Sequence, residues 1–214
     1  AYFSHSKDKE FWVYANSKLD ANLFAQLARH NGRNEEVKYI NPHNVAALKF
    51  PGSIFYPGPD LSNLAQLRSF HGNSNWTITG ITHTTSSIAA TRSISSLLHS
   101  HIYPWDALIC TSQSVKSHVQ KIFQSTESYL TQRLSCQKFV YPQLPIIPLG
   151  INTNEFNFSN EQKKSFRQSL SINDESIVVL YLGRLSFHAK AHPITMYQAL
   201  ETAAERTGQK VVLI

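Results

Sequence analysis

One apolar run near the carboxyl end constrains the fold of this chain most strongly. Residues 177–182 (IVVLYL) are largely apolar and rich in β-branched side chains, and Gly183 ends the run. A run of this kind predicts a strand that is buried on both faces, as in a parallel sheet. A basic loop follows, and Pro193 stands where the first turn of a helix accepts proline. The helical pattern ends at Gly208, a good carboxyl-terminal cap, and residues 211–214 predict another strand.

The loop after the predicted strand is a candidate anion site. Ligands of parallel α/β sheets bind at the carboxyl ends of the strands, where Gly183, Arg184 and Lys190 are expected to lie. A glycine lets the main chain approach a ligand closely, an arginine offers a fork of donors that matches a phosphate, and a lysine adds a point charge. The competing interpretation is a solvated charged loop. The position directly after a buried strand favours the anion site.

Strands and helices alternate along the rest of the chain. Ser17 and Asp60 are predicted to cap helices, and either Ser112 or Ser114 opens another. This alternation predicts parallel α/β layers, with the best domain boundary at residues 152–159. The remaining strands are predicted at residues 10–14, 37–40, 53–56, 76–82, 107–110 and 146–149, and further helices at residues 88–101 and 161–170.

Composition and charge narrow the classes of partner. The net charge is +6, yet no basic run or basic face with interleaved aromatic residues stands out, so nucleic acid is not expected as a partner. No apolar run reaches the ~20 residues that cross a bilayer. The two cysteines are too few for a disulfide scaffold, so a reduced, cytoplasmic setting is expected. The positive charge is compatible with peripheral docking at the anionic inner face of a membrane.

Several common site motifs are absent from the sequence. It contains no Gly-x-Ser-x-Gly elbow, Walker loop or Gly-x-Gly-x-x-Gly, which argues against serine hydrolases, NTPases and dinucleotide-binding proteins. His188 and His192 have the spacing of a zinc pair, but Pro193 puts His192 at a helix start, so no metal site is expected.

His83 follows the predicted strand at residues 76–82. From the residues alone, two interpretations of His83 are equally supported: a histidine of the core or of a turn, and a functional histidine.

Three stretches together resemble the GT-B glycosyltransferases, especially the large retaining family four (glycosyltransferase group 1-like). Residues 183–186 (GRLS) with Lys190 resemble the family's donor-binding loop. Residues 105–112 (WDALICTS) resemble its strand leading into a serine-capped helix, and residues 146–156 (IIPLGINTNEF) resemble its interdomain segment. The chain departs from the family pattern at Asn152, where aspartate is usual, and at Ala191, where glycine is frequent. The donor loop is also one residue longer than the commonest form.

The resemblance implies a GT-B type α/β fold. Residues 1–151 would form a Rossmann-like, acceptor-side N-terminal domain that is incomplete at its start. Residues 152–214 would form the linker and the first strand-helix-strand of a second, donor-binding Rossmann-like domain. The family's paired-glutamate motif is expected beyond Ile214, so this piece alone is expected to be inactive. The alternative left open is a complete smaller protein whose tail packs onto the first sheet.

The activity that the resemblance implies is retaining transfer of a sugar from a nucleotide-sugar to a hydroxyl of a sugar or lipid-linked acceptor. No metal or cofactor is required. Arg184 and Lys190 would stabilise the departing diphosphate, Gly183 would allow its approach, and His83 would be catalytic or contact the transferring sugar. Two alternatives remain: a non-catalytic nucleotide- or phosphate-binding α/β module, and a sugar-nucleotide epimerase of similar architecture.

Overall fold

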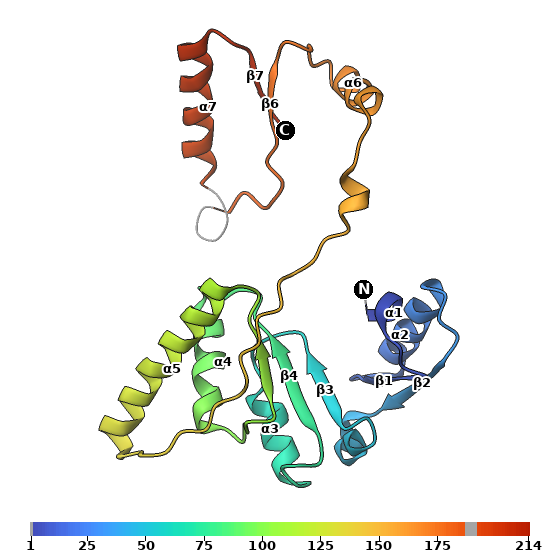
Figure 1. Cartoon of the computed structure of the whole chain (residues 1–214), viewed down its shortest axis with the longest axis vertical. Helices are drawn as coiled ribbons and strands as arrows, with labels where there is room; N and C mark the ends of the chain where they lie inside the picture. Colours follow the sequence, from blue (N-terminus) through green and yellow to red (C-terminus); the bar gives the residue numbers. More distant parts are fainter. Residues whose placement is uncertain (1, 187–191) are drawn as a thin grey trace. The chain divides into compact units, whose positions relative to one another are not determined.

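A computed structural model describes residues 2–186 and 192–214, and the chain divides into two units, Ala1–Gly150 and Ile151–Ile214 (Figure 1). The first unit contains α1 (Tyr2–His5), β1 (Glu10–Tyr14), α2 (Lys18–His30), β2 (Glu36–Ile40), η1 (Pro42–Lys49), β3 (Ser53–Tyr56), α3 (Ser62–Ser69), β4 (Thr77–Ile81), α4 (Ile88–Ser96), η2 (Leu97–His99), β5 (Ala107–Ile109) and α5 (Gln113–Leu134). The second contains η3 (Thr153–Phe156), α6 (Asn160–Ser169), β6 (Ile177–Val179), α7 (Pro193–Thr207) and β7 (Val211–Leu213).

Every paired strand described is parallel to its neighbour. The first unit has a two-stranded sheet, β1–β2, and a three-stranded sheet, β3–β4–β5, and the second unit has the pair β6–β7. Helices connect successive parallel strands, as they must where the chain has to cross from one end of a sheet to the other. The predicted α/β class with parallel, Rossmann-like layers is therefore confirmed.

Helix caps explain where several helices begin. The side chain of Ser17 accepts a hydrogen bond from Asp20 N, and that of Ser112 accepts one from Val115 N, so Ser112 is the cap of α5. The predicted cap at Asp60 is wrong. The residue before α3 is Leu61, which makes no side-chain capping bond and is fully buried. Burial of Leu61 in the core positions this helix start without help from a polar side chain.

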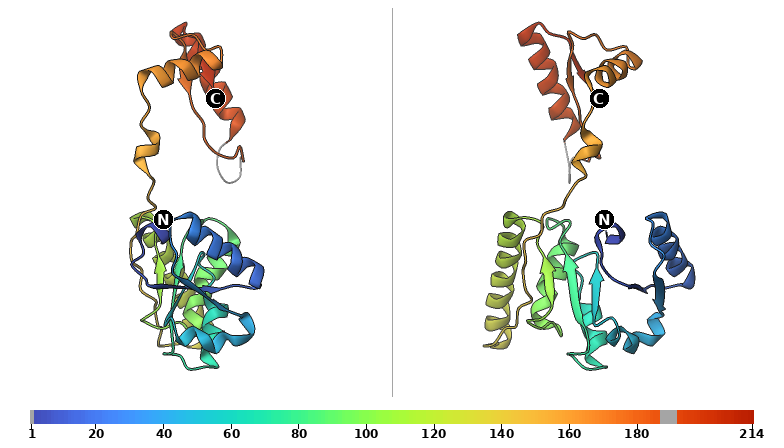
Figure 2. Two further views of the ribbon diagram at one scale, coloured as in Figure 1. Left: turned by 90° about the vertical axis from the view of Figure 1, so that its right-hand side faces the viewer. Right: turned by 45° about the vertical axis from the view of Figure 1, so that its right-hand side comes forward.

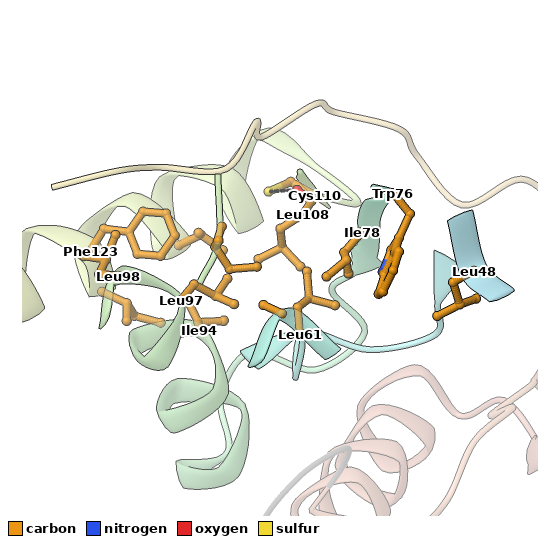
Figure 3. Packing of buried hydrophobic residues seen from close by; sticks show 14 of the residues in the cluster. Leu48, Leu61, Trp76, Ile78, Ile94, Leu97, Leu98, Leu108, Cys110 and Phe123 are labelled. Atoms are coloured by element: carbon orange, nitrogen blue, oxygen red, sulfur yellow. Dashed lines mark hydrogen bonds between the residues drawn. The ribbon is translucent and has the colours of Figure 1, made fainter. Parts of the chain in front are cut away.

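The hydrophobic core of the first unit lies between the three-stranded sheet and its helices (Figure 3). Ile78 of β4 and Leu108 of β5 are fully buried, and Ile94 of α4 and Phe123 of α5 pack in the same cluster. Helices α4 and α5 also contact each other (Figure 1). Each buried side chain of this size contributes roughly 1.5–3 kcal/mol, so this cluster is the main source of stability of the unit.

The predicted strand at residues 146–149 is replaced by two isolated bridges, Ala107↔Gln143 and Cys110↔Ile146. The segment still runs parallel beside β5, because Gln143 N donates to Asp106 O at 2.8 Å and Ile147 N donates to Cys110 O at 3.0 Å. Proline at positions 142, 145 and 148 removes backbone donors, and this interrupts the ladder.

The strand predicted at residues 177–182 is shorter and less buried than expected. It ends at Val179, and Leu180 and Leu182 are 68% and 89% exposed. Within the described residues β6 pairs with β7 alone, so the two-stranded sheet leaves much of its surface uncovered. The helix that connects them, α7, packs beside β7 (Figure 2). It begins at Pro193 and ends at Gly208 in the left-handed conformation, as predicted.

No helix in the two described ranges is both long and apolar enough to cross a membrane.

Candidate functional site

Arg184 lies in the loop that leaves the carboxyl end of β6. Its side chain is exposed, and no described residue forms a hydrogen bond or ion pair with its guanidinium. The described residues therefore leave all of its donors available to a ligand, which is the state that a phosphate-binding arginine needs. The structure places Gly183 beside it, whereas Lys190 lies outside the described residues.

The backbone of Arg184 is fixed although its side chain has no partner among the described residues. Tyr181 Oη and Ser186 N each donate a hydrogen bond of 2.9 Å to the carbonyl oxygen of Arg184. Two donors on one carbonyl restrict the direction in which the arginine side chain leaves the loop. Sequence reasoning missed this function of Tyr181. The only signal was a hydroxyl-bearing aromatic residue near the end of an apolar run.

Gly183 has a steric reason to be glycine. A Cβ at this position would lie 3.0 Å from Tyr181 Oη and 3.2 Å from Tyr181 Cζ. A Cβ there would push the Tyr181 ring aside by a few tenths of an ångström, against the hydroxyl that donates to the carbonyl of Arg184. The glycine therefore allows the tyrosine to hold Arg184.

The first turn of α7 follows the same loop. His192 is the N-cap, and its Nδ1 accepts a hydrogen bond of 3.4 Å from Thr195 N. Pro193 occupies the first turn, where its missing N–H costs nothing. The positive end of the helix dipole lies here and favours anions, as at many phosphate sites. The capping function of His192 was not predicted, because histidine is not among the usual capping residues.

His83 lies just beyond the carboxyl end of β4. Its imidazole is exposed, and it forms no hydrogen bond with the described part of the chain. The residue before it is fixed: the N and Oγ1 atoms of Thr82 both donate to Ile109 O, at 3.0 and 3.1 Å. The strand end is thus anchored to β5 immediately before His83, and the histidine side chain remains open to a ligand.

A close contact joins β4 to the loop that follows β3. A Cβ on Gly80 would lie 2.6 Å from Gly58 O and 2.6 Å from Leu61 Cδ2, so only glycine fits there. Ile81 N donates to Gly58 O at 3.2 Å. The carboxyl end of β4 is therefore held to the loop that follows β3, at the edge where His83 lies.

The opposite edge of the same sheet carries a buried ion pair that sequence reasoning missed. Arg68 and Asp106 are fully buried, and Arg68 Nη1 and Nη2 donate to Asp106 Oδ1 and Oδ2 at 2.6 and 2.7 Å. Arg68 also donates to the carbonyl oxygens of Trp76 and His101. Because Asp106 precedes β5, this pair lies at the amino ends of the strands, away from His83. We interpret it as structural.

The described residues offer no metal site, and their buried thiol is not activated. Residues 2–186 and 192–214 contain no group of three His, Cys, Asp or Glu side chains that could hold an ion; His188 lies outside them. Cys110 and Cys136 are free thiols. Burial raises the pKa of the Cys110 thiol, which disfavours the thiolate that nucleophilic attack requires.

Comparison with known proteins gives one informative similarity. The chain is 29% identical over 108 residues to an uncharacterized glycosyltransferase of Methanocaldococcus jannaschii. The aligned region covers 50% of this chain and 24% of that protein, so it spans about a quarter of the relative's length. No protein-family model matches, and no solved structure matches.

Proposed function

We propose that this chain acts in a retaining GT-B glycosyltransferase of family four, which moves a sugar from a nucleotide-sugar to an acceptor hydroxyl without a metal ion or cofactor. Its first unit would serve the acceptor and its second the donor. The similarity to an archaeal glycosyltransferase supports glycosyl transfer, and the parallel α/β sheets are compatible with the GT-B fold. The family motifs at residues 105–112, 146–156 and 183–186 support the narrower assignment.

The observation that carries the proposal is the guanidinium of Arg184. It is exposed and lacks a partner among the described residues, while two hydrogen bonds to its carbonyl hold its backbone at the end of β6. As the bond between sugar and diphosphate breaks, negative charge accumulates on the leaving group. A preorganised cation stabilises that charge, as a metal ion does in other transferases.

The other residues of the proposal have complementary functions. Lys190 supplies a second cation to the diphosphate and enters on sequence grounds alone. Gly183 permits the Arg184 loop to keep its shape and lets the donor approach. His83 contacts the transferring sugar or orients the acceptor, since a neutral imidazole can both donate and accept a hydrogen bond.

The acceptor is proposed to be a sugar or a lipid-linked sugar. A net charge of +6 favours peripheral docking at an anionic membrane surface that holds such a lipid. Two free cysteines suit the reducing cytoplasm.

Calorimetric titration of uridine and guanosine diphosphates into the whole chain tests the proposal. We expect Arg184→Ala to weaken binding by about 10- to 150-fold, since a hydrogen bond to a charged group contributes roughly 1.5–3 kcal/mol. Arg206→Ala is the matched control, because Arg206 is an exposed arginine in the last turn of α7. Equal affinity in wild type and Arg184→Ala would remove Arg184 from the site.

Turnover separates the transferase from its alternatives. A nucleotide-sugar incubated with the protein should be consumed only when an acceptor is added. Tight diphosphate binding with no consumption favours a binding module, and consumption without acceptor favours an epimerase.

A further inference from the structure

The segment between β4 and α4 carries His83 and is anchored at both of its ends. At one end, Thr82 donates two hydrogen bonds to Ile109 O. At the other, Ser87 caps α4, and its side chain accepts a hydrogen bond of 3.2 Å from Ala90 N. Residues 83–86 lie between these anchors, outside any helix or strand. Their conformation decides where the His83 side chain is presented.

One side chain from a distant part of the sequence contacts the middle of this segment. His118 Nε2, on α5, lies 3.2 Å from the carbonyl oxygen of Thr85. Throughout the described ranges, no other hydrogen bond joins residues 83–86 to another element. We infer that His118 is a positioning residue: its imidazole holds the Thr85 carbonyl and thereby sets the placement of His83. The functional part of this inference rests on the proposed function of His83.

The chemistry of the contact fixes the direction of the bond. A carbonyl oxygen can only accept, so Nε2 must carry the hydrogen. Both the Nε2–H tautomer and the imidazolium meet this condition, so the contact survives protonation of the ring. The base of the side chain is also well fixed, because the adjacent Val119 and the nearby Ile122 belong to the buried core. His118 therefore connects the rigid core to the segment that presents His83.

Backbone ¹⁵N relaxation of the whole chain tests the inference through three variants. His118→Leu removes the donor, whereas His118→Gln keeps an N–H that can reach the same carbonyl. Lys121→Leu is the matched control, since Lys121 is exposed on the same helix. In His118→Leu we expect the order parameters of residues 84–86 to fall from about 0.85 to below about 0.6. The side-chain ¹⁵N resonances of His83 should shift as well. His118→Gln should restore both, and Lys121→Leu should change neither.

Two results would overturn the inference. One is that the order parameters of residues 84–86 and the His83 resonances stay unchanged in His118→Leu. The other is a wild-type His118 in the Nδ1–H tautomer, which the ring ¹⁵N shifts report directly, even if His118→Leu loosens the whole first unit. These results do not depend on diphosphate binding by Arg184. The inference about His118 can therefore be refuted while the proposed transferase function is retained. Conversely, loss of diphosphate binding leaves the relaxation result valid.

Discussion

Replacing Asp106 by alanine is expected to destabilise the first unit far more than replacing Asp60 by alanine. Its two carboxylate oxygens accept four hydrogen bonds: one each from Arg68 Nη1, Arg68 Nη2, Ile78 N and Tyr103 N, all within 2.6–2.9 Å. Asp106→Ala leaves the guanidinium of Arg68 buried without a counter-charge. It also leaves two backbone N–H groups without their acceptor.

The magnitude follows from the burial. Both partners have a side-chain exposure of 0%, and removing one partner of a buried ion pair costs about 3–5 kcal/mol. The orphaned N–H groups are part of that loss rather than an addition to it, because all four bonds share one carboxylate. Since a domain is stable by about 5–15 kcal/mol, the variant should lose a large fraction of its stability. Replacing both partners by apolar residues should recover part of the loss, because no unpaired charge is then buried.

Urea denaturation followed by tryptophan fluorescence measures the effect. All three tryptophans, Trp12, Trp76 and Trp105, lie in the first unit, so the signal reports on that unit alone. With a slope of about 2 kcal/mol per molar urea, the midpoint should fall by roughly 2 M. Asp60→Ala is the control, because the Asp60 carboxylate makes no hydrogen bond with the described residues. Equal midpoints for Asp106→Ala and Asp60→Ala would refute the reasoning.

Two further predictions concern α5 and the segment after it. Ser135 ends the helix in the left-handed region, at φ 56°. Glycine adopts this region without strain, so Ser135→Gly should raise the free energy of unfolding by about 0.5–1 kcal/mol, whereas Ser135→Ala should not. Urea denaturation measures both variants. Burial and the hydrogen bond from Tyr141 Oη to Glu127 raise the pKa of Tyr141 to about 12. Because this folded-state pKa lies above the ordinary value, the associated stability should be present below about pH 10 and be lost as the pH rises toward 12. The difference between the ultraviolet titrations of wild type and Tyr141→Phe should reveal this phenol, and Glu127→Gln should lower its pKa. A difference that titrates near pH 10 would contradict the assignment.

The parts of the fold that local sequence patterns specify were predictable. Ser17 and Ser112 cap helices as expected, and Pro193 and Gly208 bound α7, because each acts within one turn of its own position. Predictions that depended on neighbours in space were less successful. Residues 177–182 are apolar enough for a buried strand, but their burial depends on how many strands and helices cover them, which the run itself does not encode.

The site shows the same division. Arg184 could be proposed as an anion-binding residue because a cation after an apolar run and a glycine is a local pattern; that role stays a prediction. The function of Tyr181 depends on a hydrogen bond to a loop carbonyl, and that of His118 on a contact with Thr85, 33 residues earlier. Arg68 and Asp106 are 38 residues apart and carry no shared periodicity. An arginine on an otherwise apolar helix face was the only local sign that a buried partner exists.

The prolines beside β5 also affect how copies of the chain behave toward one another. In the segment that follows α5 and runs beside β5, Gln143 N and Ile147 N bond inward to Asp106 and Cys110, so alternate positions face outward. Positions 142 and 148 of that outward row are proline and have no N–H to offer. A strand from a second molecule would find few donors there, and edge-to-edge growth toward fibrils is disfavoured along this border.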